Sequence, residues 1–132
     1  MSPAPQELYQ KHSGGYMSNR ERGAKGEAIA AAYMCRQGYT VLQRNYRAGR
    51  CEIDLILKQG ETIVFAEVKA RTTGAYGLGR EAVTPAKQHN IIKAAQAYLA
   101  ANGLYEAPIR FDVLEVELFT NAVNHIPAAF ML

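Results

Sequence analysis

The chain has 132 residues, of which 48% are hydrophobic and 20% charged, values typical of a soluble globular protein with one core. It has no run of about eighteen apolar residues, which a membrane span requires, and residues 1–16 lack the apolar centre of a signal peptide. We therefore expect a cytoplasmic protein that does not enter a membrane. The formal net charge of +3 permits nucleic-acid binding, although many basic proteins never bind it.

The N-terminal part is predicted to pass from a disordered tail into a helix. Residues 1–17 are polar, contain proline and glycine, and show no periodicity. Ser18 and Glu21 have the spacing of a capping box, in which each side chain accepts a hydrogen bond from the backbone N–H of the other residue. The helix is predicted to run to about Gln37, because Gly38 then stands at the left-handed C-cap position.

Three strands are predicted next. Residues 39–46 are rich in aromatic and β-branched side chains, and residues 47–50 form a basic turn around a glycine. Two further strands, 51–57 and 62–71, are joined by a short polar turn at 58–61. These segments predict a β-meander directly after the first helix.

A glycine-rich loop and a second helix follow. Residues 72–83 form a loop that is long enough to be functional rather than a plain connector. Thr84 as N-cap and Pro85 at the first helical position predict a helix that runs to about Ala101 and is ended by Gly103. Its apolar stripe comprises Ile91, Ala94, Ala95, Tyr98 and Leu99.

The C-terminal part adds a strand over residues 109–118 and a short one near 123–126, so that residues 18–132 are predicted to form one domain. No internal repeat is visible. Cys35 and Cys51 have no metal-ligand spacing, and we expect both to be small buried apolar residues.

The two strands of the central hairpin each carry charged residues on one face. Glu67, Lys69 and Arg71 have the same parity and project from one side of their strand. Glu52 and Asp54 share a face of the preceding strand, opposite a row of apolar residues. The hairpin therefore presents acids and a lysine opposite its packing surface.

The register decides whether these acids meet. If Gln59 and Gly60 are the centre of the turn, Glu52 lies opposite Glu67, and Asp54 lies diagonal to Glu67 on the same surface. Directly opposite Cβ atoms are ~5 Å apart and diagonal ones ~7 Å, within reach of a shared cation. A three-residue loop would separate the acids, since a slip of one residue reverses the face.

Such a cluster favours a divalent metal. Like charges on one sheet face are costly unless they are compensated, and carboxylate oxygens are suited to Mg²⁺ or Mn²⁺. Lys69 would then orient or deprotonate a water, or stabilise charge on a phosphate. The alternative interpretation is a solvated face whose acids and lysines form weak cross-strand ion pairs.

A helix adds another candidate acid. Glu27 is the only charged residue in the stretch 26–35, and its neighbours at helical spacing are small or apolar. A carboxylate on a packing face needs a partner, which the metal of the hairpin would supply. The alternative is an exposed Glu27 at the edge of the stripe. Lys87 shares the stripe of Ile91, and it either reaches the same site or extends to solvent along the surface.

Several motifs together resemble one known family, the uncharacterised YraN-like bacterial proteins. They are Gly26-Glu27, Gly38-Tyr39, Arg44-Asn45-Tyr46-Arg47, Glu52-Ile53-Asp54-Leu55-Ile56, Phe65-Ala66-Glu67-Val68-Lys69-Ala70-Arg71, Glu81-Ala82-Val83, Lys87, Arg110-Phe111-Asp112-Val113 and Ala129-Phe130. The resemblance covers residues 20–130. It departs at Cys51, where the family usually has Gly, and at Ala66, where Val is usual; neither is a candidate ligand.

That family is placed with the PD-(D/E)xK nuclease-like proteins and is similar to Holliday-junction resolvases and restriction endonucleases. The resemblance implies an α/β fold of the restriction-endonuclease-like αβββαβ type, with a central mixed β-sheet flanked by helices. It also implies Mg²⁺-dependent phosphodiester hydrolysis, with Asp54 and Glu67 as metal ligands, Lys69 as the catalytic lysine and Glu27 as the helix-borne acid. Resolvase-like proteins often act as dimers on symmetric substrates, so a homodimer is an open option.

Two classes of function follow, and the sequence leaves both open together with a weaker third. The first is a metal-dependent endonuclease acting on nucleic acid, for example on branched or damaged DNA. Its phosphate contacts are predicted at Arg47, Arg50, Arg71, Arg80 and Lys87. The second is a non-catalytic nucleic-acid-binding or accessory module with the same fold. The third is a structural protein with paired surface acids. DNA and RNA are not distinguished.

Overall fold

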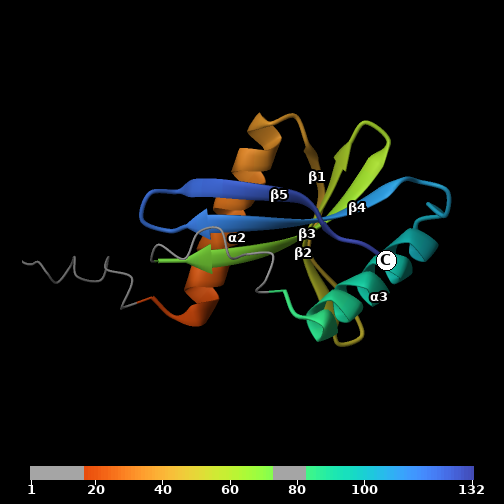
Figure 1. Ribbon diagram of the computed structural model, residues 1–132, viewed down its shortest axis with the longest axis horizontal. Helices are drawn as coiled ribbons and strands as arrows, with labels where there is room; N and C mark the ends of the chain where they lie inside the picture. The colour runs from red at the N-terminus through yellow and green to blue at the C-terminus, as the bar shows by residue number, and fades with distance from the viewer. Residues whose placement is uncertain (1–16, 73–82) are drawn as a thin grey trace, which may run out of the picture.

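The computed structural model describes residues 17–72 and 83–132. Their elements, in chain order, are α2 (Asn19–Arg36), β1 (Thr40–Ala48), β2 (Cys51–Gln59), β3 (Thr62–Arg71), α3 (Pro85–Ala101), β4 (Ile109–Glu117) and β5 (Ala122–Phe130). This order is the predicted αβββαβ core with one more strand at its end (Figure 1). The predicted tail, most of the predicted glycine-rich loop, and Arg80 lie outside the described residues.

All five strands form one mixed sheet in the order β1-β2-β3-β4-β5. Neighbouring strands are antiparallel except β3 and β4, which run parallel from the pair Ile63–Ile109 to the pair Arg71–Glu117. Parallel neighbours need a long crossover connection, and the segment that contains α3 provides it. The predicted α/β class, with a central mixed sheet flanked by helices, is confirmed.

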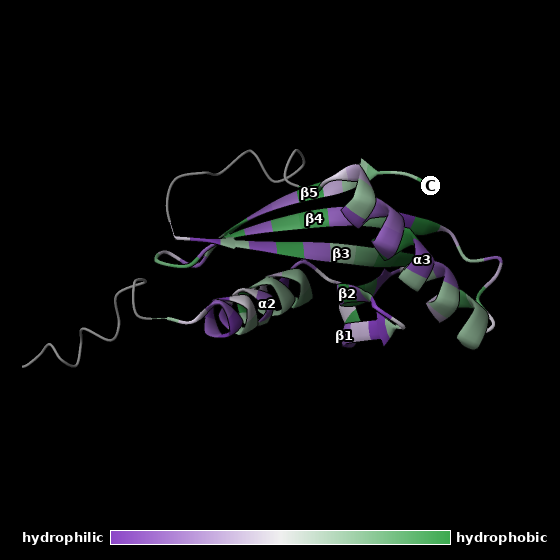
Figure 2. Ribbon diagram, turned by 90° about the horizontal axis from the view of Figure 1, so that it is seen from below, coloured by the Kyte–Doolittle hydropathy of each residue, from purple (hydrophilic) through white to green (hydrophobic). Residues whose placement is uncertain are grey.

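The two helices cover opposite faces of the sheet. Along β4, Phe111 and Val113 belong to the core that contains α3, whereas Leu114 and Val116 belong to the core that contains α2. Because successive side chains of a strand point to opposite faces, the two cores lie on the two sides of the sheet. Figure 2 shows hydrophobic segments along β3 and β4, interrupted by hydrophilic ones.

Local signals in the sequence set the helix ends as predicted. Ser18 and Glu21 form both hydrogen bonds of the capping box, at 3.1 and 2.8 Å. The Thr84 hydroxyl accepts from the N–H of Lys87 at 3.2 Å, with Pro85 at the first helical position.

No helix among the described residues is long and apolar enough to cross a membrane.

Three expectations need correction. Cys35 is exposed and Cys51 only half-buried, because Met34 takes the buried position on the last turns of α2 and Cys51 opens β2 beside the β1–β2 turn. The last strand extends over Ala122–Phe130 rather than 123–126. In the hairpin, Gln59 pairs with Thr62, so the turn is centred one residue later than predicted.

The corrected register moves β2 by two residues along β3. Gly60 takes the first central position of the turn with φ +59°, a conformation that glycine adopts without strain. A shift of two residues keeps every side chain on its predicted face. It does, however, exchange the partners: an extension of the ladder would bring Asp54, not Glu52, opposite Glu67.

Candidate metal centre

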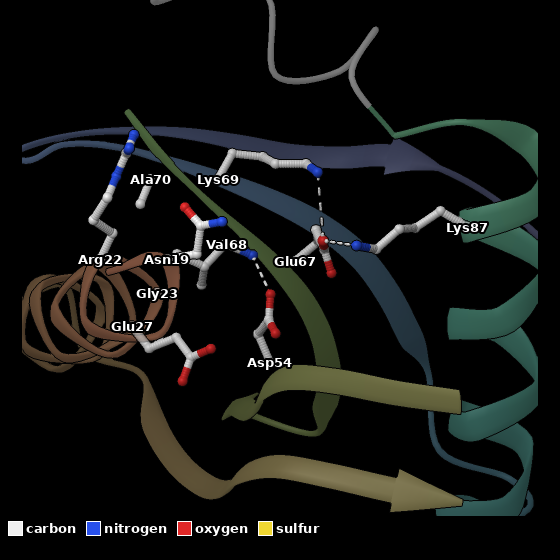
Figure 3. A pocket seen from close by; sticks show the side chains of 10 residues that line it. All are labelled: Asn19, Arg22, Gly23, Glu27, Asp54, Glu67, Val68, Lys69, Ala70 and Lys87. Carbon is white, nitrogen blue, oxygen red and sulfur yellow. Dashed lines mark hydrogen bonds and ion pairs between the residues drawn. The ribbon is translucent and has the colours of Figure 1, made fainter. Parts of the chain in front are cut away.

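The candidate site lies where β2 and β3 separate. In the described part of the chain their ladder ends at the pair Leu55–Ala66, whereas β4 follows β3 as far as Arg71. Beyond that point the Asp54 carboxylate takes the place of a ladder partner, since its Oδ2 accepts a hydrogen bond from the N–H of Val68 at 2.8 Å. This bond fixes Asp54 beside the second half of β3 (Figure 3).

Three carboxylates from three elements face this opening. Asp54 projects from β2, Glu67 from β3 and Glu27 from α2 (Figure 3). Glu67 is only 4% exposed. Burial and the neighbouring charges of Glu67 and Glu27 raise the pKa of Asp54 to about 8, against the lowering effect of the Val68 N–H. Without a further cation, the site therefore disfavours the ionised form of Asp54 beside Glu67 and Glu27.

Two lysines converge on one oxygen of Glu67. Lys87 Nζ lies 3.0 Å from Glu67 Oε2 and Lys69 Nζ lies 3.7 Å from the same atom. Burial tends to lower the pKa of Lys87, but its hydrogen bond and charge interaction with Glu67 outweigh this effect and raise it. The side chain of Lys87 is 48% exposed, yet its ammonium group points into the site from the first turn of α3 (Figure 3).

A side chain without a predicted role holds Glu27. Asn45 Nδ2 donates to Glu27 Oε1 at 2.8 Å. Asn45 in β1 lies opposite Asp54 in β2, because the residues on either side of Asn45 pair with the residues on either side of Asp54. Its backbone has a φ of +51°, which asparagine tolerates better than most residues. Burial and the charge of Glu52 raise the pKa of Glu27, while Arg44 opposes them. An asparagine inside a predicted strand was the signal in the sequence, because asparagine disfavours strands.

The predicted basic residues divide into two groups. Arg50 and Lys87 line the hollows around the acids. Arg47 instead pairs with Glu52 at 3.7 Å, and neither Arg47 nor Arg71 lines these hollows. The structure thus brings Arg50 and Lys87 together with the predicted site residues Glu27, Asp54, Glu67 and Lys69, and leaves Arg47 and Arg71 outside the hollows.

Two hollows meet at the acids. Both are lined by Asp54, Glu67 and Lys87. The first also contacts the first half of α2 and the second half of β3, through Asn19, Arg22, Gly23, Glu27, Val68, Lys69 and Ala70. The second also contacts the start of β2 and the middle of α3, through Arg50, Cys51, Glu52, Asn90 and Ile91. We call the two together the trough.

Comparison with known proteins identifies the family. The sequence model of the uncharacterised protein family UPF0102 matches residues 26–116. The chain belongs to UPF0102. A UPF0102 protein of Geobacter metallireducens is 43% identical over 118 residues, which cover 88% of this chain and 97% of the relative. One from Clostridioides difficile is 42% identical over 114 residues, 86% of this chain and 100% of the relative.

A third relative, from Chlorobium phaeobacteroides, is 52% identical over 94 residues, 71% of this chain and 74% of the relative. The predicted resemblance to YraN-like proteins is confirmed by these matches. The segment matched by the family model includes Glu27, Asn45, Asp54, Glu67, Lys69 and Lys87, whereas Asn19, Arg22 and Gly23 precede it.

The donor set of this UPF0102 protein suits a metal that needs few protein ligands. Among residues 17–72 and 83–132, no three acidic, histidine or cysteine side chains gather into a ready ligand set. Asp54 and Glu67 are a pair of hard oxygen donors in an open hollow. Mg²⁺ is commonly held by one or two carboxylates, with waters and substrate phosphates as its other ligands, so the residues present fit it.

Proposed function

We propose that this UPF0102 protein is a Mg²⁺- or Mn²⁺-dependent endonuclease that hydrolyses phosphodiester bonds in nucleic acid, probed first on DNA. The observation that carries the proposal is the meeting of Asp54 and Glu67 with two lysine ammonium groups in one open hollow. Two acids for a hard cation and two cations for a phosphate are the parts that phosphodiester hydrolysis requires.

The roles follow from the positions of the side chains. Asp54 and Glu67 would hold the cation, which when bound supplies a Lewis acid for the phosphoryl oxygen. The Val68 N–H keeps the Asp54 carboxylate oriented. Lys69 and Lys87 stabilise negative charge on the phosphate. Glu27, whose Oε1 is held by Asn45 and whose carboxylate also interacts with Asp54, would accept a proton from water.

The first prediction tests the catalytic acids and lysine. With Mg²⁺ or Mn²⁺ the protein should cleave a DNA or RNA substrate from a panel of linear, flapped and four-way forms. Asp54→Asn and Lys69→Ala should each lower the rate by about 10²-fold or more, since each removes charge stabilisation in the transition state. Glu61→Gln in the exposed hairpin turn and Lys58→Ala at the exposed end of β2 are matched controls and should cleave normally. Cleavage that survives both site variants, or EDTA, would overturn the proposal.

One observation favours a second candidate, a nucleic-acid-binding module without catalysis. Glu67 already forms two ion pairs, which compensate its charge without a metal. Such a module would bind DNA in a salt-dependent way, indifferent to Mn²⁺, with no turnover on any substrate. A thermal titration separates the two, because a cation that binds only the folded protein raises its Tm, and Asp54→Asn should abolish the rise.

A further inference from the structure

Gly23 occupies a helical position that glycine disfavours. Glycine is the least favoured residue in a helix interior apart from proline, and Gly23 lies in the second turn of α2. Packing explains the neighbouring Gly26, because a Cβ there would lie 2.8 Å from the Cβ of Ala70. No heavy atom lies within 4 Å of a Cβ built at Gly23. Packing within the described chain therefore does not require this glycine.

Gly23 instead leaves open space in the wall of the trough. It lines the first hollow with Asn19 and Glu27, which precede and follow it, respectively, at four-residue spacing on the same face of α2. Glycine is favoured where a helix backbone and a ligand approach each other closely. The absence of a side chain keeps free the space between α2 and the second half of β3.

Arg22 supplies a cation beside this space. In Figure 3 its side chain extends from α2 past Ala70 toward the C-terminal end of β3, and it lines the same hollow. No acidic side chain of the described residues forms an ion pair with Arg22. Its guanidinium is thus available to an anion, and guanidinium binds phosphate oxygens in bidentate geometry.

The two ends of the trough are alike in charge. Arg22 lines the hollow on the α2 side and Arg50 lines the hollow on the other, and the acids Asp54 and Glu67 lie where the hollows meet. A mononucleotide would occupy one of the hollows. An extended polyanion would occupy both and would have its reacting bond at the acids.

We propose that the α2 wall of the trough, formed by Arg22, Gly23 and Asn19, binds the sugar–phosphate backbone of a nucleic-acid strand on one side of the bond to be cleaved, while Arg50 binds it on the other side. The inference rests on the proposed function and adds the path of the substrate. Arginine and asparagine side chains are common phosphate ligands, and such contacts position a strand without reading its sequence.

Binding is measured by fluorescence anisotropy with a labelled 12-nucleotide single strand and the matching duplex, in EDTA so that no cleavage interferes. Arg22→Gln should weaken binding and reduce the slope of log K against log salt by about one, the effect of one lost phosphate contact. Arg20→Gln removes the same charge from an exposed position of α2 outside the hollows, and it should leave the slope nearly unchanged.

Substitution of Gly23 should change thermal stability and strand binding in opposite directions. Gly23→Ala should raise the Tm, because alanine favours the helix and the added Cβ meets no atom. The same variant should weaken strand binding, and Gly23→Gln should weaken it further. A dinucleotide should bind much more weakly than the 12-mer, since it cannot span both hollows.

The outcomes separate this inference from the proposed function. If Arg22→Gln behaves like Arg20→Gln, or if Gly23→Ala is stabilised and binds normally, the strand path is overturned while metal-dependent cleavage stands. If the unmodified protein neither binds nor cleaves any oligonucleotide, the proposed function fails and the strand path fails with it.

Discussion

Several residues of this protein have a conformation or a position that their secondary structure does not favour. Asn45 has left-handed backbone within β1, Gly23 and Gly26 lie inside a helix, where glycine is intrinsically disfavoured, and Asp54 replaces a strand partner with its own side chain. All four lie at or beside the opening between β2 and β3. Local rules of folding are often broken where a site has to be built.

Asn45 provides the prediction at this scale. Asn45→Ala and Asn45→Gly both remove the amide that holds Glu27 Oε1, so both should lower the cleavage rate by roughly 10–100-fold, the usual effect of losing a residue that orients a site carboxylate. Only alanine is strained at a φ of +51°, by about 1–2 kcal/mol. Cleavage kinetics and urea unfolding measure the two effects separately.

The glycine variant is the control for strain. If Asn45→Gly is stable and cleaves at the normal rate, Asn45 serves only the backbone of β1, and its role in holding Glu27 is excluded. If both variants lose kcat and keep KM, the amide acts on the chemistry through Glu27.

At the scale of elements, the distance between α2 and β3 determines the width of the site. Gly26 allows the close approach, because a Cβ there would lie 2.8 Å from Ala70 Cβ and 3.7 Å from Val68 Cγ1. This contact places Glu27, the next residue of α2, beside the hollow that Asp54 and Val68 also line. The packing of α2 against β3 therefore determines the position of Glu27 in the site.

Gly26→Ala should show this coupling. The added methyl group forces α2 away from β3, and overpacking of this kind typically destabilises by about 1–3 kcal/mol, more than the gain in helix propensity returns. Adding Ala70→Gly removes the atom that is struck and should restore much of the loss, as a double-mutant cycle by urea unfolding would measure. Additive effects of the two changes would contradict direct contact.

At the scale of the whole molecule, the sequence predicts elements better than their arrangement. The bounds of β3 and the caps at Ser18 and Thr84 were predicted correctly, because alternation and capping are local signals. The hairpin register was wrong by two residues, since more than one placement of Gly60 in the turn is compatible with the pattern. The position of Arg22 in the wall of the hollow and the hydrogen bond of Asn45 to Glu27 were missed, because only the folded sheet brings α2, β1 and β2 together.

A second arrangement of this kind lies away from the site and joins distant parts of the chain. Asp112 on β4 is fully buried, and its carboxylate accepts from Arg110 at 2.8 Å and from the N–H of Ala128 at 3.0 Å, and lies 2.6 Å from a ring nitrogen of His125. Arg110 also donates to the hydroxyl of Tyr39 at 2.7 Å, in the segment between α2 and β1. One carboxylate thus connects β5 with the end of the first helix.

This carboxylate should make the stability of the protein depend on acid. Burial alone would raise the pKa of Asp112, but His125, Arg110 and the Ala128 N–H outweigh it and lower the pKa. A carboxyl group whose pKa is lower in the folded than in the unfolded protein stabilises the fold fully above its unfolded pKa, near 3.9, and the stabilisation is lost as pH falls through the folded value. Urea unfolding from pH 6 to pH 2 should therefore show a fall in the free energy of unfolding below about pH 4.

Asp112→Asn should be less stable at pH 6 and should flatten that fall, whereas Glu61→Gln at an exposed turn should keep it. Equal slopes for Asp112→Asn and the unmodified protein would show that the network does not depend on this charge.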